Sequence, residues 1–291
     1  MVSFSTGLNM AAVRTTGTGL ALGKGGSAAS RLLNLIQSDV GTALIWDYAR
    51  TDRRFATPTG GANPAASGDV VGLDMDWSSH GTRTYAQVIA EGGYVGPSAV
   101  PGNHASQATG AAKPKWQAGP KPFLLYDGID DLTIVPGLIP GASGTIVSAF
   151  RATAGIAATQ AMIAGGTFSG NKRCRLALTV TGLPSFVFND QIISLPGSSD
   201  IRGTDVVMIQ TWGSGRRRCY ISTYSDPLVI DEARVANMDG AGSSYKIGSL
   251  EGGASDFFSG RIYGTLIRSV ETANADIRGI VLPAFRSLHS E

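Results

Sequence analysis

The chain has 291 residues, with 24 Lys and Arg against 22 Asp and Glu. Its basic residues are scattered apart from Arg216-Arg217-Arg218, which excludes the basic stripe that nucleic-acid binding needs. The 39 glycines and the charged fraction of only 16% are typical of many short strands joined by turns. No apolar run approaches the roughly 18 residues of a membrane span, and the N-terminus lacks a secretory pattern, so we expect neither a membrane segment nor classical secretion.

The first 41 residues are predicted to form an arm and a short helix. Residues 1–30 are rich in Gly, Ala, Ser and Thr, and this composition does not repay its ordering entropy alone. We therefore expect an extended arm that anchors on another protein or another subunit. Between Ser30 and Val40 the apolar residues recur on one helical side, with Gly41 just past the end. The main domain is expected to span residues 42–291.

The next 80 residues show few strand patterns. Thr42–Trp46 and Val70–Trp77 are predicted strands, and residues 78–122 are predicted to be mostly loop. A structureless connection of that length is usually functional or wraps a neighbour.

The stretch Phe123–Ile134 predicts two strands joined by an acidic turn. Asp127-Gly128 is a strong turn signal, because Gly accepts positive φ and Asp can bond its own backbone. Three carboxylates, those of Asp127, Asp130 and Asp131, fall within five residues.

Beyond residue 123 short strand patterns recur between turn residues, which is typical of a sandwich or barrel. The predicted strands are Gly144–Ala152, Gln160–Ala164, Arg173–Val180, Ser185–Phe188, Gln191–Leu195, Asp205–Trp212, Arg218–Thr223, Ser244–Gly248 and Phe257–Ser269. Alternation in one of them predicts one face with Cys174, Leu176, Leu178 and Val180 and an opposite face with Arg173, Arg175 and Thr179. A final helix is predicted over Ala273–Ile280, followed by Pro283.

Several of these segments, taken in order, form one pattern. They are Gly68-Asp69-Val70-Val71-Gly72 with Asp76, Gly102-Asn103-His104-Ala105-Ser106-Gln107-Ala108-Thr109, Lys113-Pro114-Lys115-Trp116, Tyr126-Asp127-Gly128-Ile129-Asp130-Asp131, Tyr245-Lys246-Ile247-Gly248, and Phe257-Phe258-Ser259-Gly260-Arg261-Ile262-Tyr263-Gly264. The pattern resembles the concanavalin A-like, laminin-G-like jelly-roll domains of bacteriophage structural proteins. The resemblance covers roughly residues 42–288 and leaves the N-terminal arm unexplained.

The resemblance implies an all-β, lectin-type (concanavalin A-like) jelly-roll β-sandwich, with the extended N-terminal arm and short helices near residues 30–40 and 273–280. It implies a non-enzymatic structural protein of a phage or phage-like particle, made in the bacterial cytoplasm and exposed on the virion as a tail, baseplate or head-fibre component. The expected partners are other virion proteins, reached through the arm, and a host surface glycan. Virion appendages are often symmetric, so a homo-oligomer, either a trimer or a ring, is expected. The alternative function is a free-standing carbohydrate-binding lectin module, and a glycan hydrolase ranks third.

The acidic turn has two interpretations. Asp127, Asp130 and Asp131 can supply oxygen ligands to a structural calcium ion, although Ile129 breaks the EF-hand spacing. The favoured interpretation is turn structure, in which the carboxylates accept backbone N–H groups. No other cofactor is expected.

Catalysis is not expected from the sequence. The glutamates are scattered, and the two facing carboxylates that a glycosidase needs are not indicated by any Glu-x-Asp-x-x-Glu run. The chain has three histidines, His80, His104 and His289, and no Gly-x-Ser-x-Gly elbow accompanies them.

Carbohydrate binding needs aromatic faces and polar groups on exposed loops. The candidate residues are Trp77, Tyr85, Tyr94, Asn103 and His104. Trp116, Tyr126 and Trp212 are interpreted as packing residues instead.

Two further features concern contacts within and between chains. Arg216, Arg217 and Arg218 are placed at a hairpin tip, either as a solvated turn or as a contact with an acidic patch on a neighbouring subunit. Cys174 and Cys219 are predicted to be small core residues, with a disulfide between neighbouring strands as the minority interpretation.

Overall fold

The computed structural model describes most of the chain from residue 105 onward and short pieces before it. The described residues are 31–32, 35–36, 43–47, 54–55, 65–74, 105–135, 140–167, 172–189, 191–195, 199–234, 244–250 and 255–289. The N-terminal arm predicted for residues 1–30 lies outside them. Among the described residues, no helix is long and apolar enough to cross a membrane.

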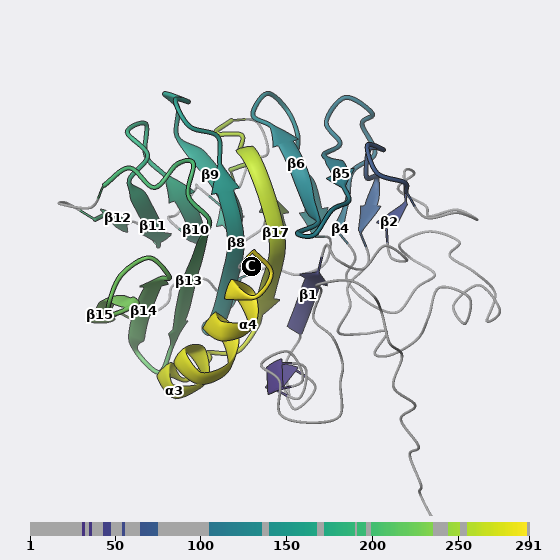
Figure 1. The fold of residues 1–291 in the computed structure, drawn as a ribbon. Helices are drawn as coiled ribbons and strands as arrows, with labels where there is room; N and C mark the ends of the chain where they lie inside the picture. The colour runs from purple at the N-terminus through teal and green to yellow at the C-terminus, as the bar shows by residue number, and fades with distance from the viewer. Residues whose placement is uncertain are drawn as a thin grey trace, which may run out of the picture.

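Two antiparallel sheets form the molecule (Figure 1). Sheet A contains, in spatial order, β15 (Leu228–Ala233), β14 (Arg216–Ile221), β13 (Val206–Gly213), β8 (Gly144–Ala152), β17 (Ser259–Arg268), β6 (Phe123–Asp127) and β5 (Lys115–Gln117), and β1 (Ala43–Asp47) also pairs with β17. Sheet B contains β12 (Gln191–Ser194), β11 (Pro184–Phe188), β10 (Lys172–Leu178), β9 (Gln160–Thr167), β16 (Tyr245–Ile247), β7 (Thr133–Val135), β4 (Ala105–Ser106), β3 (Leu73–Asp74) and β2 (Arg54–Phe55). The predicted lectin-type, all-β sandwich is confirmed.

The core between the sheets is apolar and aromatic. Alternate residues of each strand point into it, among them Phe150 from β8, Phe186 from β11 and Met208 from β13, all fully buried. Burying such a side chain contributes about 1.5–3 kcal/mol, so this layer dominates the stability of the domain. Cys174 and Cys219 are both buried in this core and form no disulfide, which confirms them as core residues.

Helical turns cover the outer face of sheet A. The C-terminal segment consists of α3 (Asn274–Asp276), the π-helical η3 (Ile277–Val281) and α4 (Leu282–Arg286), and it lies across the sheet (Figure 1). Its buried side chains pack on outward residues of β8, β13, β14 and β17 in a second apolar cluster. Leu32 and Ile36, which lie in the predicted N-terminal helix, belong to the same cluster.

The two strands predicted on either side of the acidic turn are confirmed as β6 and β7. β6 belongs to sheet A and β7 to sheet B, so the turn carries the chain across the sandwich. A hairpin and a crossover have the same strand–turn–strand pattern, because each strand still alternates buried and exposed residues. The pairing partners decide between them, since β6 pairs with β5 and β17 whereas β7 pairs with β4 and β16.

Several predicted strand boundaries also change. The strand Gly144–Ala152 is confirmed as β8, while β14 begins two residues earlier than predicted, at Arg216. The turn before it consists of Ser214 and Gly215, with φ of 49° and 74°. The edge strand β15 was not predicted, and residues 78–122, expected to be mostly loop, contain β4 and β5.

The C-terminal helix is longer than predicted. It continues past Pro283 because the proline occupies one of the first two positions of α4, where its missing N–H costs little. The preceding π-helical turn widens the backbone at this point.

Candidate functional site

The acidic turn is built by hydrogen bonds from its own backbone. Asp127 Oδ1 accepts the N–H groups of Ile129 at 2.8 Å and Asp130 at 3.4 Å. Asp131 Oδ2 accepts the N–H group of Asp127 at 2.8 Å. These bonds confirm the turn interpretation, because the carboxylates satisfy backbone donors at the crossover between the sheets.

The same three carboxylates lie close enough to share a cation. One oxygen of each of Asp127, Asp130 and Asp131 lies within 4.8 Å of the others. The pKa of Asp131 is raised to about 6, mainly by burial and also by the charges of Asp127 and Asp130, while the hydrogen bond from the Asp127 N–H acts against this shift. The donors are oxygens, as calcium prefers, but three ligands are half of the usual six to eight. A structural calcium ion stays a prediction, which calcium titration with a melting-temperature readout would test.

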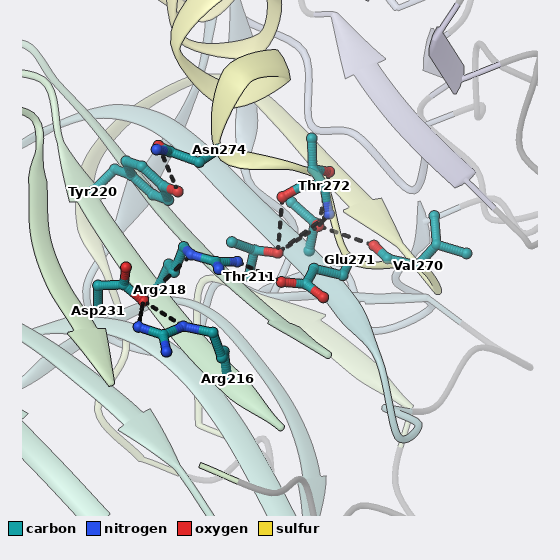
Figure 2. Close-up of polar contacts among 10 residues, drawn as sticks. Thr211, Arg216, Arg218, Tyr220, Asp231, Val270, Glu271, Thr272 and Asn274 are labelled. Carbon is teal, nitrogen blue, oxygen red and sulfur yellow. Dashed lines mark hydrogen bonds and ion pairs between the residues drawn. The ribbon is translucent and has the colours of Figure 1, made fainter. Parts of the chain in front are cut away.

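The three consecutive arginines are divided by the alternation of β14. Arg216 and Arg218 point to the outer face of sheet A, where both contact Asp231, at 2.7 Å and 3.3 Å (Figure 2). Arg218 also pairs with Glu271 at 2.6 Å. Arg217 points into the sandwich and is fully buried. Each arginine therefore has an acidic partner in its own chain, and a contact with a neighbouring subunit stays a prediction.

A group of polar contacts joins the C-terminal helix to the outer face of sheet A. Tyr220 donates its hydroxyl hydrogen to Asn274 Oδ1 at 3.2 Å (Figure 2). The backbone N–H of Thr272 donates to the hydroxyl oxygens of Thr145, at 2.9 Å, and Thr211, at 3.2 Å. These contacts hold the turn between β17 and the helix in place, so these polar residues have a structural role.

The residues predicted to bind glycan, Trp77, Tyr85, Tyr94, Asn103 and His104, all lie outside the described residues. They belong to the segment that joins β3 to β4 in the sequence. Both of these strands lie in sheet B, and β4 pairs with β7. One end of the predicted glycan-binding segment therefore begins at β3, and the other ends at β4, which lies between β3 and β7.

Three paired residues with chemically different side chains form a row on the outer face of sheet B, across β4, β7 and β16. Ser106 on β4 pairs with Ile134 on β7, which pairs with Lys246 on β16. Directly paired residues share a face, and Tyr245 and Ile247, on either side of Lys246, point into the core. Ile134 is 36% exposed, and Ser106 and Lys246 are partly exposed. We refer to Ser106, Ile134 and Lys246 as the Ile134 row.

The register continues from the Ile134 row toward a buried charge pair. Lys246 pairs with Ala164 on β9, which pairs with Arg175 on β10. Arg175 Nη1 lies 3.5 Å from Asp256 Oδ2. Burial raises the pKa of Asp256, and the charge of Arg175 acts against this shift. The face thus carries hydroxyl, aliphatic, ammonium and ion-paired groups in sequence.

The large aromatic residues near the ends of strands belong to the packing of the sandwich. Trp116, Tyr126 and Trp212 are 4%, 1% and 0% exposed, which confirms the packing interpretation. Trp212 donates its indole N–H to the carbonyl of Gly141 at 3.0 Å, as a buried indole requires.

No catalytic residues were predicted, and His289 is the one histidine among the described residues. It is buried against the ring of Tyr263, with ring centroids 5.7 Å apart, and burial lowers its pKa. Tyr263 in turn donates its hydroxyl hydrogen to Asp205 at 2.8 Å. These contacts explain His289 as a residue that secures the C-terminal segment on sheet A.

The Ile134 row was not predicted from the sequence. The local signal was present, because Lys246 stands between two apolar residues in a strand pattern. What the sequence lacks is the register that brings β4, β7 and β16 side by side, since these strands are far apart along the chain.

No protein-family model and no characterised protein matches the sequence. Solved structures do resemble the fold. The K499G mutant of NanB sialidase from Streptococcus pneumoniae has 15% identity and a TM-score of 0.42, over 54% of this chain and 27% of that chain. The Ruminococcus gnavus IT-sialidase CBM40 bound to alpha2,3 sialyllactose has 15% identity and a TM-score of 0.40, over 50% and 83%. Trypanosoma rangeli sialidase in complex with DANA has 11% identity and a TM-score of 0.48, over 89% and 37%.

These likenesses concern the fold alone, and the chain spans 27% of the length of the NanB chain. Sialidases and a carbohydrate-binding module are thus among the proteins with a similar β-sandwich, and none of the three is a virion protein. The expectation of a non-enzymatic protein is corrected by this finding, because the structures that resemble the chain include enzymes.

Proposed function

We propose that this chain is a glycan-binding β-sandwich domain, with its ligand on the outer face of sheet B at the Ile134 row. The observation that carries the proposal is the position of this row beside the ends of the segment that holds Trp77, Tyr85 and Tyr94. A sugar offers hydroxyl groups and a C–H face, so a hydroxyl, an aliphatic group and an ammonium group in one row are suitable partners.

A row of similar chemistry lies on the outer face of the other sheet. On sheet A, Leu125 is 37% exposed and pairs with Lys115 and Arg261, both exposed. Lys115 lies on the edge strand β5. The Ile134 row lies on inner strands, and Lys246 Nζ donates to the carbonyl of Ser244 at 3.4 Å. The Ile134 row is preferred because it includes β4, at one end of the segment that holds Trp77, Tyr85 and Tyr94.

A glycan array with the full chain tests this proposal, followed by titration of the best ligand. Ile134→Ala and Lys246→Ala are expected to weaken binding about tenfold each, which corresponds to roughly 1.4 kcal/mol. Leu125→Ala is the matched control, because it shortens an equally exposed aliphatic side chain on sheet A, and it is expected to bind as the unmodified chain does. Failure to bind any glycan, or equal losses in all three variants, would overturn the proposal. Release of free sugar during the same incubation would show that binding is coupled to hydrolysis.

As a second proposal, the chain is a structural component of a phage or phage-like particle, as its resemblance to phage structural proteins suggests. Two of the segments that carry the resemblance come together in space, since Gly128 in the acidic turn lies against Ser259 at the start of β17, and a Cβ on Gly128 would lie 2.7 Å from Ser259 Cβ. This contact supports a common structural role for these segments. Mass spectrometry of purified particles, with and without residues 1–41, tests the setting and the anchoring arm together. Normal incorporation of the chain without residues 1–41 would contradict the anchoring role. Absence of the full chain from the particles would contradict the proposal that it is a particle component.

A further inference from the structure

A buried cation lies between the sheets at the side closed by β15. Arg217 is 0% exposed, and Glu232 lies directly opposite it on β15. The Arg217 guanidinium carbon lies 5.6 Å from the ring centroid of Phe188 on β11. Trp212, opposite Arg217 on β13, packs on the same Phe188 ring at 5.7 Å. The guanidinium thus lies in an aromatic setting, where a charge without hydrogen bonds is costly.

The carboxylate of Glu232 is poorly aligned with the guanidinium of Arg217. Arg217 Nη2 lies 3.0 Å from Glu232 Oε1. Yet Nε, Nη1 and Nη2 of Arg217 and Oε1 of Glu232 are all buried without a hydrogen bond, so the two groups are close but misaligned. A guanidinium presents its N–H groups in a planar fork that matches a carboxylate in two parallel hydrogen bonds. The present pair forms neither bond.

Glu232 is able to leave this position. β15 is the edge strand of sheet A and pairs with β14 alone among the described strands. The side chain of Glu232 is 30% exposed, so a rotamer change would carry its carboxylate into solvent. A ligand carboxylate that then took its place would restore the charge balance at Arg217, since one anion replaces another.

We propose that Arg217 is an internal carboxylate-binding site, occupied in this structure by Glu232 and open to a small monocarboxylate when Glu232 turns outward. The ligand carboxylate would accept two hydrogen bonds from the guanidinium fork. This site is separate from the Ile134 row, so the inference does not rest on the proposed function.

Chemical rescue of the full chain tests this inference. Glu232→Ala removes the resident carboxylate and is expected to melt at a lower temperature than the unmodified chain. Formate at about ten times its dissociation constant is expected to raise the melting temperature of Glu232→Ala by about 3 °C, and chloride at equal ionic strength is not. The double variant Arg217→Met, Glu232→Ala should show no formate effect.

Asp231→Ala is the matched control, because it removes the neighbouring carboxylate of β15, which faces the exposed arginines on the outer face. Equal formate effects in this control, in the double variant and in Glu232→Ala would overturn the inference, as would no effect in any of them. The Arg217 Nε–Hε resonance of the unmodified chain supplies an independent measurement if Glu232→Ala does not fold. Formate is expected to shift this resonance, and an unchanged resonance at saturating formate would also overturn the inference.

Discussion

The two outer faces of the sandwich differ in what covers them. On sheet A the helical segment buries Ile277, Val281 and Phe285 against outward residues of the strands. On sheet B no described helix packs on the outer face, and Ile134 and Ile192 remain 36% and 55% exposed. A covered face contributes to stability, whereas a face with partly exposed apolar and charged side chains is suited to contact with another molecule.

This difference means that substitutions on the two faces should have different consequences. Changes under the helix should lower the free energy of unfolding, and changes in the Ile134 row should leave it nearly unchanged. The following predictions test this separation, from the largest expected effect to the smallest.

The largest effect is expected from Phe285→Ala under the helix. Phe285 is 0% exposed in the cluster that joins α4 to sheet A. Its truncation should lower the free energy of unfolding by about 3–5 kcal/mol, because it removes buried area and leaves a cavity. Chemical denaturation measures the change. Ile129→Ala, at a side chain 73% exposed, is the control and should have no measurable effect. A loss below about 1 kcal/mol in Phe285→Ala would mean that the helix does not stabilise this face.

The crossover between the faces should make stability depend on pH. Burial raises the pKa of Asp131 to about 6 in the folded chain, from 3.8 in the unfolded chain. The folded state therefore holds the proton more tightly, so the contribution of Asp131 is fully present below pH 4 and is lost as the pH rises to about 6. The loss is at most about 3 kcal/mol, and solvent screening makes it smaller.

Asp131→Asn isolates this contribution, because the amide oxygen still accepts the N–H group of Asp127 but does not titrate. The unmodified chain should lose stability relative to the variant between pH 4 and pH 6.5 in denaturation curves. A constant difference across this range would contradict the assigned pKa. Other carboxylates, such as Asp200 with its lowered pKa, shift both proteins equally and cancel in the difference.

The sequence predicted the fold better than it predicted which residues come together on the faces of the sheets. Alternation correctly placed Cys174 and Leu176 in the core and Arg173 and Arg175 on the opposite face of the strand, because the side-chain period of a strand is local. Both arginines are nevertheless buried, at 5% and 7% exposure. The sequence did not indicate that the turn at Asp127–Asp131 crosses between the two sheets, because the pairing of β6 with β17 and of β7 with β16 spans more than a hundred residues. The Ile134 row was missed for the same reason, because its register depends on the whole topology. The Arg217–Glu232 pair lies on consecutive strands and was missed because β15 was not predicted.

The smallest expected effects concern the charged contacts that hold the helix on sheet A. Arg218 and Glu271 are each 19% exposed, whereas Arg278 and Asp226 are 39% and 68% exposed. Glu271→Gln should cost about 1 kcal/mol, because it leaves the partly buried Arg218 with Asp231 as its remaining acidic partner. Asp226→Asn should cost less, since its oxygen still accepts the N–H group of Leu228 and the lost pair is largely screened by solvent.

Salt separates the two contacts. At 1 M salt the cost of Asp226→Asn should disappear, because exposed charges are screened over about 3 Å, while the cost of Glu271→Gln should persist. Denaturation at low and high salt measures both variants against the unmodified chain. Equal salt sensitivity would show that the contact between Arg218 and Glu271 is as solvated as the outer pair. The helix would then be held on sheet A by its apolar contacts alone, and the two faces would differ only in apolar burial.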